Sequence, residues 1–184
     1  MKSTLKRAAR ETYIAAGIVG LLGAGASIGA QGATATVTAT AVVLQPIAIT
    51  NTVAMTFGNV VAGNGVVTLT TLGVRTAAAG TLPTGVTPVV GSFTITGTSG
   101  NSFSITTNTS DTNLSDGTPA DNMAVTWSYE VDDTASATGA NLNPATHTFT
   151  SGSAYAYVGA AVTVGAAQPA GTYTGNFVAV INYN

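Results

Sequence analysis

Histidine is the side chain most often used for acid–base chemistry near neutral pH, and this sequence contains one, His147. Serines and aspartates that could complete a catalytic triad are plentiful, but no G-x-S-x-G elbow or similar motif accompanies them. His147 lies between Thr146 and Thr148 in a β-type run, so we expect a solvent-facing strand residue. The sequence therefore predicts no catalytic residue and no enzyme.

Residues that could bind a metal are also few. One histidine and no cysteine leave almost nothing from which to build a zinc site. The run from Asp111 to Gly117 is similar to the start of a calcium loop, but its glycine comes one position late and Asn122 replaces the final glutamate. We interpret this run as a solvated loop, leave calcium binding open as the alternative, and predict no cofactor.

The one tryptophan, Trp127, and Tyr129 could form a platform for a sugar ring. Aromatic residues in an alternating strand more often belong to the core, because they carry much of its buried area. We therefore expect core positions for both. A self-contained secreted adhesin, presenting loops 108–122 and 132–145 to a glycan or matrix partner, stays open as the alternative function.

The N-terminal residues follow the pattern of a secretory signal peptide. Four basic residues lie between Met1 and Arg10, an apolar run extends from Ile14 to about Ala26, and small residues place the cleavage after Ala26 or Ala30. The apolar run is short and glycine-rich for a membrane anchor, which is the alternative. We expect export, with the protein in the periplasm in transit and then at the cell surface or outside the cell.

The charge of the remaining chain excludes several kinds of partner. From Gln31 onward there are one basic residue, Arg75, and six acidic residues, which gives a formal charge of −5. One cation cannot neutralise a run of phosphates, so nucleic acid is excluded. Electrostatic binding to an anionic membrane is excluded for the same reason. Without cysteine, the exported domain must be held by its core and its backbone pairing.

Side chains that alternate between apolar and polar dominate the chain after the signal peptide, and this period of two is typical of strands. Five strands are clear, at 92–97, 102–106, 123–131, 154–164 and 171–184, and shorter ones are expected at 55–58, 66–71 and 146–150. We expect the strands at 92–97 and 102–106 to form a hairpin, and Asn64-Gly65 signals another turn. No helix is indicated, so the sequence predicts an all-β sandwich or barrel.

The last stretch, Gly171 to Asn184, alternates over its whole length. We expect its apolar and aromatic odd-numbered face to lie on the core. The candidate residues of this terminal strand are Tyr173, Phe177, Ala179, Ile181 and Tyr183. The even-numbered face is apolar only at Val178 and Val180, where we expect partial burial by a second neighbour.

A long extended segment, residues 33–49, precedes the domain. One of its faces carries Ala35, Val37, Ala39, Ala41 and Val43, and threonines alternate with them. Pro46 interrupts the segment because it has no N–H to donate. Proteins protect exposed strand edges with lysine, proline or bulges. Residues 33–43 contain neither lysine nor proline. We therefore expect this strand either to pair within its own sheet or to add to another sheet.

Several motifs resemble known exported proteins. The C-terminal run from Gly171 to Tyr183 resembles the last strand of pilin-type subunits of the archaic chaperone–usher group, including spore-coat-U-like proteins. Met55 to Val60 is similar to a short F-G motif near the start of those subunits. The fuller order of motifs resembles an exported bacterial family catalogued as a domain of unknown function. It comprises Phe57-Gly58, Gly73-Val74-Arg75, the run from Ser92 to Gly100, and Gly171 to Tyr183.

This resemblance implies an immunoglobulin-like antiparallel β-sandwich that is incomplete and is completed by a donor strand. In the implied organisation, residues 1–30 are the signal peptide, 31–43 the donor extension and 44–184 the sandwich, in which Tyr173 to Tyr183 border the groove. The implied function is a structural, pilin-like subunit of a surface fibre, which is a homo-oligomer. A periplasmic chaperone, for which Tyr183 would be an anchor, and an usher would assemble the fibre. The chain departs from those pilins in two respects: it lacks a cysteine pair, and its donor face is rich in alanine. Burial of apolar surface stabilises by about 25 cal/mol per Å², so the small alanine side chains would make this donor strand bind more weakly than one with leucine or valine.

Overall fold

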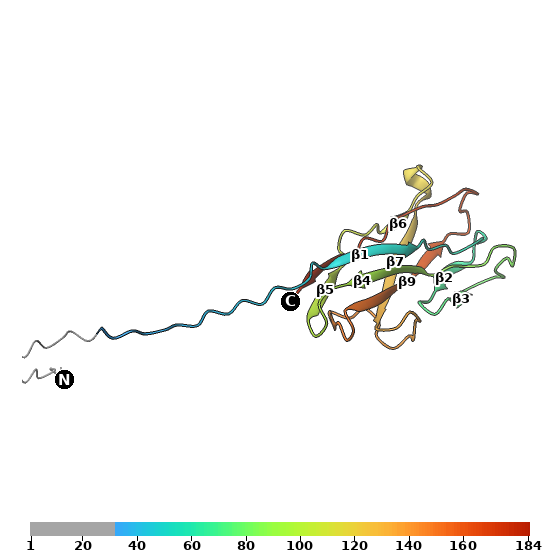
Figure 1. Cartoon of the computed structure of the whole chain (residues 1–184). Coiled ribbons are helices and arrows are strands. Elements are labelled where there is room, and N and C mark those ends of the chain that lie inside the picture. Colours follow the sequence, from blue (N-terminus) through green and yellow to red (C-terminus); the bar gives the residue numbers. More distant parts are fainter. Residues whose placement is uncertain (1–31) are drawn as a thin grey trace, which may run out of the picture. The chain divides into compact units, whose positions relative to one another are not determined.

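The computed structural model describes residues 32–184, so the expected signal peptide lies outside the described residues. The chain divides into two compact units, Met1–Thr40 and Ala41–Asn184. Residues 32–40, the described part of the first unit, are exposed and have no regular secondary structure. The second unit is all-β and begins its first strand only at Ala48, two residues after the expected interruption at Pro46 (Figure 1).

The larger sheet of the described chain is organised around strand β9 (Ser153–Val164). Along one side, β9 pairs with β7 (Met123–Asp132) over eight residue pairs. Along its other side, β9 pairs first with β4 (Gly91–Thr96) and then with β2 (Gly65–Leu69). The outer strands of this sheet are β1 (Ala48–Val53) beside β4, β3 (Arg75–Ala77) beside β2, and β6 (Asn113–Leu114) beside β7. All of these pairs are antiparallel.

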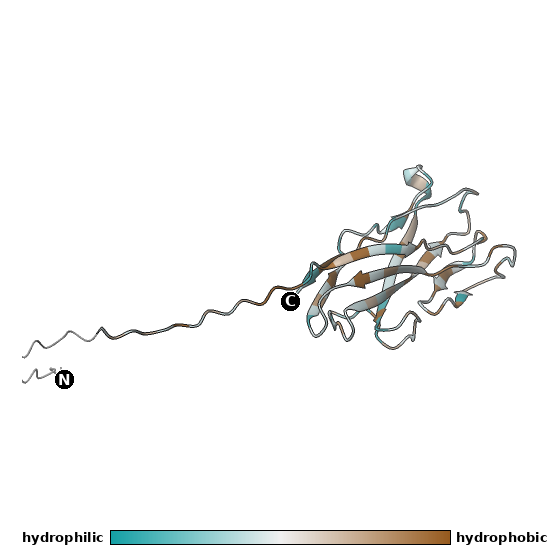
Figure 2. Ribbon diagram, viewed as in Figure 1, coloured by the Kyte–Doolittle hydropathy of each residue, from teal (hydrophilic) through white to brown (hydrophobic). Residues whose placement is uncertain are grey.

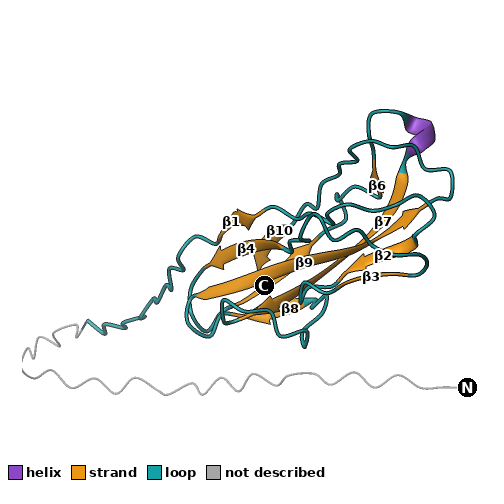
Figure 3. Cartoon of the chain, turned by 90° about the vertical axis from the view of Figure 1, so that its right-hand side faces the viewer, coloured by secondary structure: helices purple, strands orange, loops and turns teal. Residues whose placement is uncertain are grey.

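The smaller sheet has β5 (Ser102–Thr106) in its centre, with β10 (Val180–Tyr183) and β8 (Thr146–Thr148) antiparallel on either side. A short 3-10 helix, η1 (Pro119–Asp121), lies between β6 and β7 (Figure 3). The two sheets pack on a hydrophobic cluster that includes Ile95, Phe103 and Phe149, and a second cluster continues along the larger sheet around Val67, Met123 and Val162. The prediction of an all-β antiparallel sandwich is therefore confirmed. Among the described residues, the structure contains no helix long and apolar enough to cross a membrane.

The core follows directly from the alternation along the strands. In β9, the even-numbered side chains from Ala154 to Val164 are buried between the sheets, and the odd-numbered tyrosines Tyr155 and Tyr157 lie on the outer face. Figure 2 shows the resulting bands of hydrophobic and hydrophilic residues along the strands. Phe103 and Phe149 are fully buried, and their rings lie 4.5 Å apart, so the two aromatic residues join β5 to the segment after β8.

The expected hairpin between 92–97 and 102–106 is wrong. Both strands exist, as β4 and β5, but they belong to opposite sheets. The linking residues pair with the segment 149–152 instead: Gly97 donates its N–H to Gly152, and Gly100 donates to Phe149. The link therefore crosses from one sheet to the other, a step that local alternation cannot reveal.

The expectations between residues 55 and 77 are also corrected. A single bridge, between Thr56 and Val89, replaces the expected strand at 55–58, and the short strand β3 was not predicted. The turn expected at Asn64-Gly65 is present, but it forms no hairpin, since β2 pairs with β3 and β9. The side chain of Asn64 holds this turn. Asn64 is buried, its Oδ1 accepts from Val61 N at 2.7 Å, and its Nδ2 donates to Ala79 O at 2.9 Å.

Candidate functional site

The terminal segment, residues 171–184, alternates in burial as strictly as in sequence. Every odd-numbered residue from Tyr173 to Tyr183 is partly buried, and every even-numbered residue is exposed. Phe177, Ile181 and Tyr183 pack against the core cluster built around Phe103 and Phe149. The burial expected for Val178 and Val180 is absent, since these side chains are 37% and 46% exposed.

Only one edge of the terminal segment is paired within the described chain. Thr174 exchanges two backbone hydrogen bonds with Ser115, Asn176 O accepts from Asp111 N, and Asn184 N donates to Ser102 O. All of these are even-numbered residues. Because successive residues of a strand direct their backbone groups to opposite edges, the N–H and C=O groups of the odd-numbered residues face away from β5. No described strand pairs with them there, and β10 is an edge of its sheet.

A second unpaired edge lies on the larger sheet. Strand β1 pairs with β4 along one side and forms the outer limit of that sheet. The chain after β1, residues 54–60, continues without regular pairing apart from the bridge at Thr56. Two edges without a partner among the described strands therefore border the same side of the sandwich.

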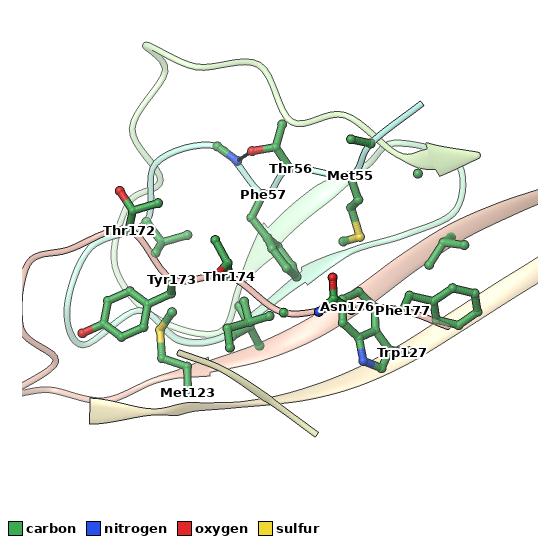
Figure 4. Close-up of a pocket in the computed structure, with 18 of the residues that line it drawn as sticks. Met55, Thr56, Phe57, Met123, Trp127, Thr172, Tyr173, Thr174, Asn176 and Phe177 are labelled. Carbon is green, nitrogen blue, oxygen red and sulfur yellow. Dashed lines mark hydrogen bonds between the residues drawn. The ribbon is translucent and has the colours of Figure 1, made fainter. Parts of the chain in front are cut away.

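A hollow of about 620 Å³, lined by both polar and apolar groups, lies between residues 51–60 and residues 171–177, and we call it the groove. Its walls carry Met55 and Phe57 on one side and Tyr173 and Phe177 on the other (Figure 4). Its floor comes from β4, β7 and β9, and includes the following side chains: Phe93, Met123, Trp127, Val158 and Val162. The groove is large enough to receive several apolar side chains.

Arg75 fixes the first wall of the groove. Its Nη1 donates to Phe57 O at 2.6 Å and to Asn59 O at 3.0 Å, and its Nη2 donates to Pro83 O at 2.7 Å. Gly58 has φ of +71°, and a Cβ there would lie 2.6 Å from Val86 O and 2.8 Å from Arg75 Nη1. The motifs Phe57-Gly58 and Gly73-Val74-Arg75, far apart in sequence, thus form one structural unit.

Tyr183 fixes the end of the terminal segment. Its hydroxyl accepts from Thr98 N at 2.7 Å and donates to Gln45 O at 2.8 Å, and Gln45 N donates to Thr98 Oγ1 at 2.7 Å. A Cβ on Gly97 would lie 2.5 Å from the Phe149 ring and 2.6 Å from the Tyr183 hydroxyl. The close approach of these two aromatic residues explains why the run from Ser92 to Gly100 contains glycine at this position.

The five residues of the expected donor face are all exposed and outside any strand: Ala35, Val37, Ala39, Ala41 and Val43. Val37 is 91% exposed and Val43 is 92% exposed. The sequence pattern does not predict that Met55, Phe93 and Trp127 line a common groove. Only the pairing of distant strands brings these three side chains together, and no local pattern carries that information.

The residues considered for chemistry have structural roles. The expectation of a solvent-facing His147 is wrong, because its side chain is 13% exposed, its Nε2 lies 3.0 Å from Asp133 Oδ1, and its ring packs edge-on against Phe103. Trp127 Nε1 donates to Asp111 O at 2.6 Å, and its ring lies 5.7 Å from that of Phe177. Trp127 thus forms part of the groove floor instead of an open sugar platform.

The calcium alternative receives no structural support. Asp111 Oδ2 accepts from Asn176 N at 2.6 Å and from Asn176 Nδ2 at 3.2 Å, so this carboxylate ties its loop to the terminal segment. Asp116 Oδ1 accepts from Thr118 N at 2.8 Å within its own turn. Across residues 32–184, no three acidic or histidine side chains gather in a way that could hold a metal ion.

Comparison with known proteins places the sandwich in a family. Residues 47–183 match the model of a family described as a domain of unknown function, DUF4402. No curated protein and no solved structure matches the chain. The matched span runs from the residue before β1 to the last residue of β10, so it coincides with the sandwich and includes both walls of the groove. Because this span is well over half of the chain, the protein belongs to the DUF4402 family.

Proposed function

We propose that this protein is a structural, pilin-like subunit of a surface fibre, in which residues 31–43 of one copy add as a strand to the groove of the next copy. One observation carries the proposal: a hollow of about 620 Å³, with aromatic and aliphatic side chains among its lining residues, lies between two chain edges that have no partner strand among the described residues. An added strand would supply hydrogen bonds to the edges and side chains to the hollow.

The edges support strand addition because their backbone groups are available. The odd-numbered residues from Tyr173 to Tyr183 direct their side chains toward the core and their backbone groups away from β5. A strand that paired with them would alternate in the same way, with every second side chain over the groove floor. An exposed sheet edge is a template on which such a strand can pair.

The composition of residues 31–43 supports the same role. The segment has no charged residue and alternates small apolar residues with threonine, so it can place one dry face on the groove and one polar face toward water. Fully burying Val37 and Val43 would contribute about 1.5 to 3 kcal/mol each. The alanines add less, so backbone hydrogen bonds would account for much of the association.

The proposal includes export and assembly partners. Residues 1–30 would be removed as a signal peptide, and a periplasmic chaperone would cover the groove until an usher passes the subunit to the fibre. The apolar side chains of an uncovered groove, beside two unpaired edges, would otherwise promote unspecific association in transit.

Electron microscopy of the purified protein tests the proposal. We expect fibres from the intact protein and monomers from a variant that lacks residues 31–43. Monomers of the intact protein, with residues 31–43 protected in their own sheet, would instead favour the self-contained adhesin. Fibres from the deletion variant would exclude this segment as the donor.

A matched pair of substitutions tests the register within the segment. Ala39→Asp places a charge on the face expected over the groove, and Thr38→Asp places the same charge on the opposite face. Because an uncompensated charge is strongly disfavoured in an apolar site, Ala39→Asp should abolish fibres while Thr38→Asp leaves them. Equal behaviour of the two variants contradicts the proposed face.

A further inference from the structure

The connection between β7 and β8, residues 133–145, covers an edge of the larger sheet. Asn143 N donates to Tyr129 O at 2.6 Å, Tyr129 N donates to Asn143 Oδ1 at 2.9 Å, and Asn141 Nδ2 donates to Val131 O at 3.1 Å. A bridge between Glu130 and Leu142 completes the contact. This connection, which we call the edge loop, occupies backbone groups of β7 that would otherwise be free to pair with another strand.

A buried carboxylate holds the edge loop on the sheet. Glu130 is fully buried on the outer face of β7. Its Oε1 accepts from Thr138 N at 2.7 Å and from Gly139 N at 3.1 Å, both in the edge loop, and its Oε2 accepts from Thr71 Oγ1 at 2.6 Å. Three donors that converge on one carboxylate favour its ionised form.

A second carboxyl group lies beside the first. Asp132 is two residues further along β7 and therefore on the same face. Its Oδ1 accepts from Thr138 Oγ1 at 2.8 Å, so Thr138 binds both carboxyl groups. Its Oδ2 is buried and has no hydrogen-bond partner, the one such side-chain atom among residues 32–184.

No cation balances these two carboxyl groups. Arg75 is the one lysine or arginine among residues 32–184, and its guanidinium binds carbonyls at the groove wall. His147 contacts Asp133 at the start of the edge loop. Across the sheet, Tyr157 pairs with Glu130 and Tyr155 with Asp132. Burial, followed by the negative charge of Asp132, raises the pKa of Tyr157, so its hydroxyl stays neutral.

We infer that Glu130 and Asp132 share one proton and that this proton stabilises the contact of the edge loop with β7. The loop is therefore closed in acid and opens as the pH rises. With a proton on Oδ2, the Asp132 carboxyl group can donate a hydrogen bond to Glu130, and the otherwise unpartnered Oδ2 atom is satisfied. Removing this proton leaves two buried negative charges side by side without a counter-ion, a costly arrangement. The edge of β7 near Tyr129 and Val131 would then become accessible.

The directions of the two titrations agree with the geometry. Burial, followed by the neighbouring Glu130 carboxylate, raises the pKa of Asp132. Burial would also raise the pKa of Glu130, but the hydrogen bonds from Thr71, Gly139 and Thr138, together with the neighbouring Asp132 carboxyl group, outweigh it and lower that pKa. The folded form of Asp132 therefore holds its proton to a higher pH than the unfolded form does, and this contribution is lost as the pH rises through the raised value.

Hydrogen exchange of the purified protein tests the inference. The protection of the Thr138 and Gly139 amides, corrected for intrinsic exchange, should fall as the pH rises from the unfolded pKa of Asp132, about 3.9, toward its raised folded pKa, by up to about tenfold for each pH unit, and should level off above the folded pKa. In Asp132→Asn, which cannot ionise, the protection should stay within about twofold over the same range. Constant protection in the unmodified protein, or an equal fall in Asp132→Asn, would overturn the inference.

Two further measurements keep the test decisive. Asp133→Asn removes the neighbouring contact with His147 but keeps both carboxyl groups, so the fall in protection should persist, and its loss would assign the effect to Asp133 instead. Carbon NMR of the unmodified protein should show the Asp132 carboxyl still protonated at a pH above its unfolded pKa of about 3.9. Two carboxylates that are both ionised at that pH would contradict the shared proton even if Asp132→Asn does not fold.

Discussion

The hydroxyl of Tyr183 donates a 2.8 Å hydrogen bond to the carbonyl of Gln45, 138 residues earlier in the chain. This bond joins the end of the terminal segment to the point where the chain enters the sandwich. The same hydroxyl accepts from Thr98 N, so three distant segments meet at one oxygen atom. The penultimate aromatic residue thus has a role inside the subunit, whether or not it also contacts a chaperone.

Tyr183→Phe should destabilise the fold by about 1 to 3 kcal/mol, because it leaves the N–H of Thr98 and the carbonyl of Gln45 without their partner. Urea unfolding measures the change in the free energy of unfolding. Tyr155→Phe is the matched control, since Tyr155 lies on the outer face and no hydrogen bond of its hydroxyl is found among the described residues. Equal effects of the two substitutions would show that the Tyr183 hydroxyl contributes nothing specific.

The alternation of apolar and polar residues in the sequence predicted the strands that have one solvent-exposed face. The runs at 92–97, 102–106, 123–131 and 154–164 all form strands close to their predicted bounds, whereas the strand expected at 171–184 is wrong over most of its length, since only Val180–Tyr183 is a strand. The period of two is clearest in β9, where every second residue is buried, as in Ala154, Ala156 and Val158. The fold class follows from these runs together with the absence of helical spacing.

The pairing of the strands could not be predicted, because it depends on contacts between distant residues. The run from Ser92 to Ser102 reads as a hairpin, but Gly97 pairs with Gly152 and Gly100 with Phe149, which direct the chain into the second sheet. His147 reads as exposed because its neighbours are threonines, yet Asp133 and Phe103 surround it. The groove could not be predicted from the sequence for the same reason, since the residues of its two walls are more than 100 positions apart in the chain.

Arg75→Lys should loosen the first wall of the groove. The guanidinium donates to three carbonyls at once, whereas an ammonium group is a point charge without the planar fork and cannot replace that geometry. We expect a loss of about 1 to 3 kcal/mol in the free energy of unfolding. Hydrogen exchange should also be faster for the amides of residues 56–60 than for those of β9. Exchange that stays unchanged at 56–60 would show that Arg75 does not hold the wall.

Glu130→Gln should flatten the acid limb of the stability curve. The pKa of Glu130 is lowered in the fold, so its contribution is present above the unfolded pKa of about 4.3 and is lost as the pH falls through the folded value. The free energy of unfolding of the unmodified protein should therefore rise with pH below about 4.3, and that of Glu130→Gln should rise less. Asp116→Asn, in an exposed turn, controls for the loss of one carboxylate. An acid limb equally steep in Glu130→Gln would assign it to other groups.

Phe177 and Val178 are neighbours on opposite faces of the terminal segment, and they offer the most direct test of which face builds the sandwich. The ring of Phe177 lies 6.1 Å from that of Phe93, 5.7 Å from that of Trp127 and 6.1 Å from that of Tyr129. Phe177→Ala removes all three contacts and should cost about 3 to 5 kcal/mol. Val178→Ala removes apolar atoms from an exposed side chain and should change the free energy of unfolding by less than about 0.5 kcal/mol. If Val178→Ala proves as costly as Phe177→Ala, the even-numbered face is buried in solution by a neighbour absent from the single chain.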